Sequence, residues 1–207
     1  AQIAQVALWL MDHQMNLRVS EEFGLYFARI PLKTSPHIVH GNALRLDWND
    51  VLPAVRCSYV LGNPPFVGKH YQSHLQKSDA LQVYDGLKSA SDLDFVAAWF
   101  VKAAMYAQNT SMRSAFVATN SLTQGEQVPL LWPLLIQKYG VRINFAHRTF
   151  QWSNEASGKA AVHCVIIGFC RSDVSPKRIF EYETPRSTPH EILVEHISPY
   201  LTDAPDI

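Results

Sequence analysis

A short apolar run that ends in a glycine, an amide and two prolines constrains this chain more than any other feature. Residues 59–61 are typical of a short buried strand. Gly62, Asn63, Pro64 and Pro65 follow and stop that strand abruptly. Asn63 precedes a proline and is therefore held in an extended conformation. The sequence thus predicts a rigid loop at a strand end, where open α/β sheets bind ligands.

The chemistry of this loop is unusual because it offers acceptors without competing donors. Pro64 and Pro65 have no backbone N–H, so their carbonyls and the Asn63 amide oxygen face no neighbouring backbone donor. A planar amino group brings two N–H donors and suits such a pocket. Phe66 adds an apolar face on which a flat heterocycle can stack. The loop therefore fits a planar amino-bearing ring.

Asn-Pro-Pro-Phe after a hydrophobic strand resembles the catalytic motif of amino-group methyltransferases that use S-adenosylmethionine. Adenine-N6 DNA methyltransferases are the leading members of that family. The resemblance implies that Asn63, Pro64, Pro65 and Phe66 are the catalytic residues. A rigid turn that ends a strand without any chemistry is the alternative that the tetrapeptide alone leaves open.

Composition excludes several other classes of protein. The chain has 207 residues, with 18 basic and 18 acidic side chains. This balance argues against a self-sufficient DNA-binding surface, which is normally basic. No apolar run approaches the roughly 20 residues of a membrane span, so we expect no membrane partner. Cys57, Cys164 and Cys170 stand in apolar contexts and are expected to be buried thiols, which fits a cytoplasmic protein.

No metal site is expected. His70 and His74 have the spacing of one helical turn, but no third ligand candidate stands near them in the sequence. Ordinary solvated histidines are the simpler interpretation. The pattern of strands and helices, in contrast, is informative. We expect helices at 2–16, 92–108 and 126–138, a loop with a helical piece at 67–90, and strands at 37–40, 57–61, 114–119, 141–150, 161–169 and 178–182.

This order predicts an α/β fold with a mostly parallel sheet and an antiparallel C-terminal hairpin. It is similar to the second half of the Rossmann-like class I methyltransferase fold. The likeness extends over most of the chain, toward large bacterial enzymes that fuse adenine methylation to a restriction nuclease. By this resemblance Asn42 reads the adenine of the cofactor, while Phe150, with Trp152 as substitute, stacks on a flipped target base.

Two parts of the family pattern are missing from the sequence. No two of the nine glycines stand one residue apart, so there is no Gly-x-Gly cradle for the cofactor. The acidic residue that holds the ribose hydroxyls is missing as well. We therefore expect a fragment, with residues 1–185 forming the catalytic half of the methyltransferase domain. Residues 186–207 are expected to connect it to a target recognition domain that is not in this sequence.

A missing pair of strands would leave the strand at 57–61 with an open edge. Unpaired N–H and C=O groups at such an edge invite another strand. We expect either that residues 37–40 pair with this edge or that another copy of the chain covers it and forms a homodimer.

The function predicted from these features is site-specific DNA adenine-N6 methylation in a restriction-modification system, by the longer protein. The base would be flipped out of the duplex because its amino group is out of reach in the stack. Methylation of guanine N2 in ribosomal RNA or of a protein glutamine is the enzymatic alternative, because both use an Asn-Pro-Pro-aromatic motif. A non-catalytic scaffold is the alternative from another class.

The missing glycine cradle gives a first prediction. Asn42 alone would contribute about one hydrogen bond, ~1 kcal/mol net, whereas micromolar affinity requires about 8 kcal/mol. The 207-residue chain by itself should therefore show no measurable binding of S-adenosylmethionine in titration calorimetry. A dissociation constant in the low micromolar range would show that the cofactor site is misplaced.

Overall fold

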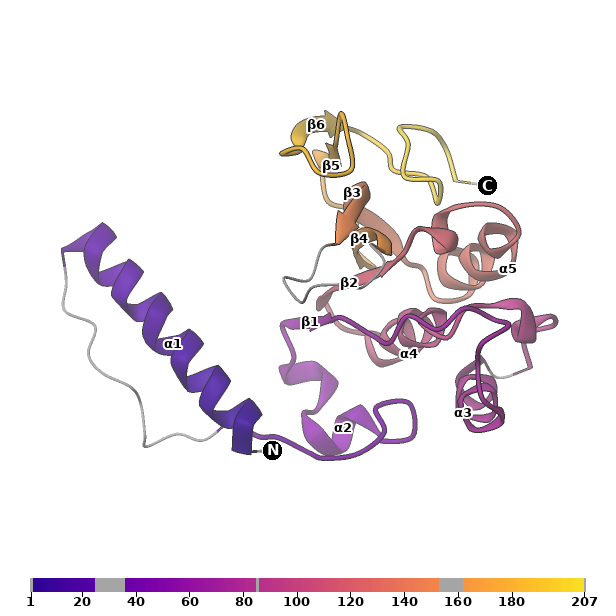
Figure 1. The fold of residues 1–207 in the computed structure, drawn as a ribbon, viewed down its shortest axis with the longest axis horizontal. Helices are drawn as coiled ribbons and strands as arrows, with labels where there is room; N and C mark the ends of the chain where they lie inside the picture. Colours follow the sequence, from indigo (N-terminus) through magenta and orange to yellow (C-terminus); the bar gives the residue numbers. More distant parts are fainter. Residues whose placement is uncertain (1, 25–35, 85, 153–161, 207) are drawn as a thin grey trace. The chain divides into compact units, whose positions relative to one another are not determined.

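A computed structural model describes residues 2–24, 36–84, 86–152 and 162–206 of the chain. The chain divides into two compact units, residues 1–51 and residues 52–207, which are described separately below (Figure 1).

The first unit contains one long helix and a short one. Helix α1 (Gln2–Phe23) is longer than the predicted helix at 2–16 and has no buried residue, although its composition favoured a helix packed in a core. Residues 37–40, predicted as a strand, form no strand pairing, because no other described segment aligns with them. His37 instead places its Nδ1 2.7 Å from the carbonyl oxygen of Val51, in helix α2 (Trp48–Val51).

The second unit is built on a six-stranded sheet with the order β1-β2-β4-β3-β5-β6. Its strands are β1 (Tyr59–Gly62), β2 (Arg113–Thr119), β3 (Arg142–Trp152), β4 (Val162–Cys170), β5 (Lys177–Glu181) and β6 (His190–Val194). β1 is parallel to β2, and β3 is parallel to β5. β4 is antiparallel to both of its neighbours, and β6 is antiparallel to β5.

These pairings mean that β1, β2, β3 and β5 all run in one direction, and β4 and β6 run in the other. The sheet is therefore mostly parallel in strand direction, and the β3–β4 pair is the expected antiparallel hairpin. The predicted α/β class and the hairpin are confirmed. Residues 153–161, between these two strands, lie outside the described residues.

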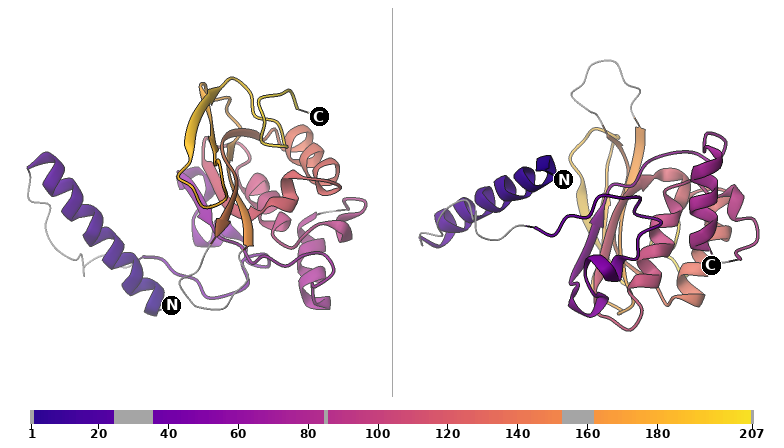
Figure 2. Two further views of the ribbon diagram at one scale, coloured as in Figure 1. Left: turned by 45° about the horizontal axis from the view of Figure 1, so that its top comes forward. Right: turned by 90° about the horizontal axis from the view of Figure 1, so that it is seen from below.

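Helices of this unit lie to one side of the sheet (Figure 2, right). They are α3 (His74–Tyr84), α4 (Ala97–Tyr106) and α5 (Gln127–Pro133), accompanied by the short 3-10 turns η1 (Ala54–Arg56), η2 (Ala90–Asp92) and η3 (Asn120–Thr123). The predicted helix at 126–138 is present, but beyond Pro133 it continues as the π-helix η4 (Leu134–Lys138). Proline has no N–H to donate to the preceding turn, which explains the irregularity there.

The core between these helices and the sheet is aromatic. Phe100 on α4 lies fully buried, with its ring 5.2 Å from Phe116 on β2 and 5.5 Å from Phe169 on β4. The indole of Trp132 on α5 completes the group at 6.5 Å from Phe100. Large buried aromatic rings contribute much of the burial free energy of a domain of this size. This cluster therefore holds two strands and two helices in place.

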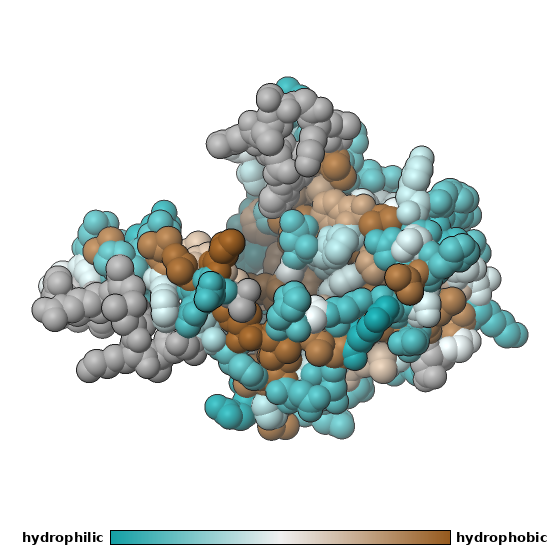
Figure 3. Space-filling model, turned by 60° about the horizontal axis from the view of Figure 1, so that its bottom comes forward, coloured by the Kyte–Doolittle hydropathy of each residue, from teal (hydrophilic) through white to brown (hydrophobic). Residues whose placement is uncertain are grey.

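Strand β1 differs from the expectation of a buried strand. Tyr59 and Leu61 are 65% and 74% exposed. β1 lies at the end of the strand order, and among the described residues only β2 pairs with it. One edge and one face of this strand are thus without cover, and hydrophobic side chains remain visible at the surface of the molecule (brown in Figure 3).

The chain beyond residue 185, expected to be a connector, contributes to the sheet instead. β6 pairs with β5 along five residues. Ile197 and Leu201, which follow β6, are each only 2% exposed. The proline- and threonine-rich composition had favoured a linker, but buried apolar side chains at these positions pack the segment against the unit. Folded structure therefore continues past residue 185.

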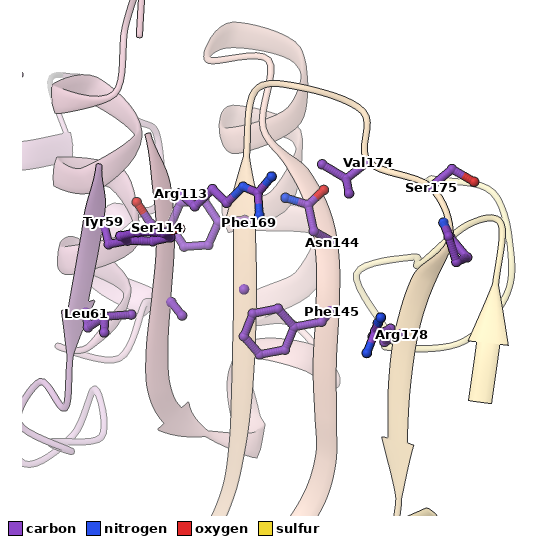
Figure 4. Close-up of a pocket in the computed structure, with 13 residues that line it drawn as sticks. Tyr59, Leu61, Arg113, Ser114, Asn144, Phe145, Phe169, Val174, Ser175 and Arg178 are labelled. Carbon is purple, nitrogen blue, oxygen red and sulfur yellow. The ribbon is translucent and has the colours of Figure 1, made fainter. Parts of the chain in front are cut away.

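One cross-strand pair depends on a glycine. Gly168 on β4 lies directly opposite Phe145 on β3, and the Phe145 ring covers it so closely that an added Cβ would lie 2.0 Å from a ring carbon. Figure 4 shows this ring extending from β3 toward the neighbouring strand. An aromatic side chain over a glycine shields the backbone that a side chain would otherwise cover.

Gly168→Ala should therefore destabilise the chain by about 1–3 kcal/mol, because the methyl group displaces the Phe145 ring. The same substitution in a Phe145→Ala background should cost much less, since the clashing ring is gone. Urea unfolding of the four proteins of this cycle measures the difference. An equal cost in both backgrounds would contradict the proposed contact.

Candidate functional site

The carboxyl ends of the parallel strands meet at one edge of the sheet. Thr119, the last residue of β2, pairs with Cys164 on β4, and Cys164 pairs with Phe150 near the end of β3. These three residues form one row across the sheet, so the ends of β2 and β3 are two strand spacings apart, about 10 Å. β1 runs parallel to β2 and ends at Gly62 on the same side. The sequence motifs at 63–66 and 150–152 thus belong to one edge.

The Asn-Pro-Pro-Phe loop begins directly after β1, as predicted. Pro64 is buried, Asn63 and Pro65 are exposed, and Phe66 is half-buried. Among the described residues, neither the Asn63 side chain nor the Pro64 carbonyl has a hydrogen-bond partner. Two acceptors that stay available at the carboxyl end of a parallel strand are suited to receive the donors of a bound group.

Gly62 fixes where this loop starts. An added Cβ at Gly62 would lie 3.1 Å from the Phe116 ring, closer than side chains normally approach. Phe116 itself belongs to the aromatic core and is 2% exposed. The lack of a side chain therefore lets the end of β1 lie directly on the core. The position of Asn63 is set by the packing of the residue directly before it.

The continuation of the loop is tied to the rest of the unit by hydrogen bonds. Lys69 donates its backbone N–H to the Asp94 carboxylate at 2.8 Å, and Val67 accepts at its carbonyl from the Phe95 N–H at 2.9 Å. The ammonium of Lys69 is paired with the Glu126 carboxylate, and this hydrogen bond raises the pKa of Lys69. These contacts hold the loop against segments that come from other parts of the chain.

Asp94 stands shortly before the apolar helix α4, a position where an aspartate often caps a helix. However, α4 has no side-chain cap. The Asp94 carboxylate accepts hydrogen bonds from two loops instead, at Lys69 and at Ser121. A capping aspartate and an aspartate that joins two loops can both stand before an apolar helix. The sequence alone therefore does not distinguish these two roles.

Phe150 lies in an aromatic cluster at the end of β3. Its ring stacks on Tyr182 with centroids 5.5 Å apart and meets the imidazole of His147 edge-on at 6.4 Å. His147 stacks in turn on Phe180 at 4.3 Å, and its Nδ1 lies 2.8 Å from the Tyr182 hydroxyl. The strand is irregular between His147 and Phe150, which reorients the side chains beyond it. Phe150 remains half-buried in this cluster.

Burial changes the acid–base behaviour of the two polar members of the cluster. It lowers the pKa of His147 below its usual value and raises the pKa of Tyr182. Both shifts favour the uncharged forms, because an apolar environment solvates charge poorly. At neutral pH the cluster is therefore a neutral platform of flat rings. Tyr182 and Phe180 were not singled out from the sequence, since β5 carried no motif.

Two other predicted residues stay less defined. Trp152 pairs through its backbone with Val162, and its side chain is outside the described part of the structure. Asn42 belongs to the first unit, where its Oδ1 accepts from the Leu44 N–H at 2.9 Å. The nearby Asp47 has a structural role, because its carboxylate accepts from the Asn49 N–H at the start of α2. The cofactor role of Asn42 stays a prediction.

A groove of about 530 Å³ opens on the face of the sheet that Tyr59 and Leu61 share (Figure 4). It reaches Arg113 at the start of β2, Phe145 near the start of β3 and Arg178 on β5. These positions lie toward the amino ends of the parallel strands. The groove is thus at the opposite end from the Asn-Pro-Pro-Phe loop, and ligands of open α/β sheets bind at the carboxyl ends. We assign no substrate to it.

The described residues show no group of three or more His, Cys, Asp or Glu side chains placed to hold a metal ion. No helix among them has the length and apolar character needed to cross a membrane. Cys164 and Cys170 are buried and Cys57 is half-exposed, all as free thiols. Cys57 therefore departs from the expected burial, because it precedes an edge strand.

Comparisons with known proteins agree on one family. The family model described as "MmeI, DNA-methyltransferase domain" matches residues 1–181. "DNA methyltransferase A" of Bacillus subtilis (strain 168) is 42% identical over 99% of this chain and 23% of its own length. The structure of the Type IIL restriction-modification enzyme MmeI in complex with DNA is 63% identical, with a TM-score of 0.89 over 100% of this chain and 28% of that chain. The chain thus spans about a quarter of each relative.

The lowered pKa of His147 gives a prediction for stability against pH. The unfolded chain binds a proton at this histidine near the usual pKa of 6.5, and the folded chain does so only at lower pH. Stability is therefore fully present above about pH 6.5 and falls as the pH drops below it. Between pH 7 and pH 5 the melting temperature should fall less for His147→Gln than for the unmodified protein. His74→Gln, on the exposed side of α3, is the control and should leave the fall unchanged.

Proposed function

Since the chain belongs to the family of MmeI DNA-methyltransferase domains, we propose that residues 52–207 form the part of a DNA adenine-N6 methyltransferase that holds the target base. The observation that carries this proposal is the loop after β1. Asn63 and the Pro64 carbonyl present acceptors that no other described residue engages, at the carboxyl end of a parallel strand. Phe150 lies at the same edge.

In this proposal the two acceptors bind the two hydrogens of the adenine amino group. Asn63 Oδ1 accepts one and the Pro64 carbonyl accepts the other, which directs the nitrogen lone pair out of the ring plane. Pro64 has no N–H that would repel the amino group, and its burial keeps its carbonyl in one place. The gain in rate comes from orientation and fixed dipoles, and no covalent nucleophile is needed.

The ring of the base would lie between aromatic side chains. Phe66 is half-buried, so part of its face remains accessible for stacking. Phe150 is supported from behind by Tyr182, whose hydroxyl is in turn fixed by His147. A base taken out of a duplex needs such a replacement for its lost stacking neighbours. Trp152 is the substitute that we propose for Phe150.

S-adenosylmethionine is the methyl donor that we propose, as the family resemblance implies. When bound it supplies an electrophilic methyl group. Within this chain the proposed contact with the donor is limited to Asn42, whose Oδ1 accepts from the Leu44 N–H. The sequence contains no Gly-x-Gly cradle. We therefore propose that segments outside these 207 residues hold most of the donor.

The complete protein would be a restriction-modification enzyme that acts on DNA. This proposal rests on the relatives, which are named as a DNA methyltransferase and a restriction-modification enzyme. We call residues 1–207, joined to the further segments of such relatives, the extended enzyme. A neutral charge balance supports the idea that DNA recognition lies elsewhere in that protein. Dimerisation through the open edge of β1 stays a prediction.

The two alternative functions differ in the support that they have. Methylation of ribosomal guanine or of a protein glutamine has no support from the comparisons, which point to DNA methyltransferases. A scaffold without catalysis would make the loop after β1 purely structural. In that case the side chain of Asn63 would be dispensable, and the following experiment separates the two proposals.

In the extended enzyme, Asn63→Ala should lower the rate of methyl transfer to DNA by about 10²-fold or more, because a positioned acceptor is lost. Asn63→Asp should retain more activity, since its carboxylate still accepts a hydrogen bond. Single-turnover transfer of labelled methyl groups measures both. Asn16→Ala, which removes a surface amide on α1, is the matched control and should not change the rate. Full activity of Asn63→Ala would support the scaffold.

A further inference from the structure

A buried carboxylate lies beside the proposed base pocket without a part in the function so far. Asp94 is 7% exposed and stands between η2 and α4. Its Oδ1 accepts the backbone N–H of Lys69 at 2.8 Å, and its Oδ2 accepts the hydroxyl of Ser121 at 2.5 Å. Lys69 is three residues beyond Phe66, and Ser121 is two residues beyond the end of β2. One side chain thus joins the two loops that follow β1 and β2.

The residues on both sides of Asp94 reinforce the same connection. Phe95 donates its N–H to the Val67 carbonyl at 2.9 Å, and the Leu93 carbonyl accepts from the Gln72 side chain at 2.9 Å. The N–H of Asp94 itself donates to Gln127 Oε1 at 3.1 Å, at the start of α5. The segment 93–95 therefore bridges the loop at 67–72 to the segment that leads into α5.

The far side of this bridge is itself well anchored. Ser121 Oγ lies 2.8 Å from Thr119 Oγ1, and Trp132 donates its indole N–H to the Leu122 carbonyl at 2.7 Å. Leu122 and Trp132 are almost fully buried. The η3 turn is thus fixed to the core. Because Asp94 binds both this turn and the loop that follows Phe66, it holds the loop in a fixed position relative to the core.

The charge of Asp94 is a strong feature of this arrangement. Hydrogen bonds to an ionised acceptor are shorter and stronger than neutral ones. Tyr84 on α3 is 2% exposed, and its pKa is raised first by burial and second by the negative charge of Asp94. The carboxylate is therefore close enough to act on a buried neighbour. The Lys69 ammonium is paired with Glu126, so the donors that Asp94 binds directly are an N–H and a hydroxyl.

We propose that Asp94 is a positioning residue for methyl transfer, whose carboxylate holds the loop after Phe66 against the η3 turn and so fixes the Asn63 acceptor and the Phe66 ring. The proposal rests on the function proposed above. Without the carboxylate, the loop keeps its backbone contact at Val67 but loses the one at Lys69. A misplacement of about 1 Å at a reacting geometry costs on the order of 10²-fold in rate.

The test uses the extended enzyme with Asp94→Ala, Asp94→Asn and Ser121→Ala. Asp94→Ala should lower kcat roughly 10- to 100-fold, with KM for the methyl donor and for DNA unchanged. Asp94→Asn should restore most of kcat, because its Oδ1 still accepts from Lys69 and its amino group can donate to Ser121 Oγ. Ser121→Ala should give an intermediate loss, since it removes one of the two attachments.

Asp206→Ala is the matched control. Asp206 is also a carboxylate with two partners, Arg142 at 3.1 Å and His196 at 3.3 Å. Its removal should leave kcat unchanged. If Asp94→Ala does not fold, Ser121→Ala decides the matter, because it deletes only a hydroxyl. An unchanged kcat in Ser121→Ala, or an Asp94→Asn enzyme as impaired as a folded Asp94→Ala enzyme, would overturn the proposal.

The outcome also separates this proposal from the function on which it rests. If Asn63→Ala is inactive while folded Asp94→Ala and Ser121→Ala have normal kcat, only the positioning role fails. If Asn63→Ala is fully active, both proposals fail, since there is no acceptor for Asp94 to position. A loss of kcat in Asp94→Ala with restoration in Asp94→Asn supports both.

Discussion

The contact between Gly62 and the Phe116 ring determines where the proposed chemistry can take place. Phe116 on β2 is held by Phe100 on α4 and Phe169 on β4, so its position is set by one helix and two strands together. The lack of a side chain at Gly62 lets the end of β1 lie directly on that ring, where an added Cβ would come within 3.1 Å. The rigid loop that starts at Asn63 follows Gly62 directly, so this contact also fixes where the loop begins. The packing of the core therefore sets the positions of the two hydrogen-bond acceptors, at Asn63 and Pro64.

Much of this arrangement could be predicted from the sequence, because the motif and the strand patterns are local. The strand before Asn63 and the hairpin that carries Phe150 each follow from apolar runs and their breaks. What the sequence could not show depends on partners far along the chain. β1 has the composition of a buried strand but is exposed because its place in the strand order is an edge. Residues 37–40 have the composition of a strand but form none, because a strand also needs a neighbouring strand to pair with.

The roles of Asp94 and Tyr182 were hidden for a related reason. An aspartate before an apolar helix predicts a cap, and only the folded chain reveals that Lys69 and Ser121 each donate to one of its two oxygens. Tyr182 stands after a strand without a motif, and its value lies in supporting Phe150. The groove beside Tyr59 and Leu61 lies toward the amino ends of the strands, whereas the proposed base pocket lies at their carboxyl ends.

The two prolines after β1 also affect how the chain behaves at high concentration. β1 offers an unpaired edge of only four residues, Tyr59–Gly62. Pro64 and Pro65 follow within three residues and provide no N–H, so an added strand could not extend its ladder past them. The same residues that leave carbonyls available for an amino group therefore act as gatekeepers against edge-to-edge aggregation. Replacing them to probe catalysis would also expose the molecule to self-association.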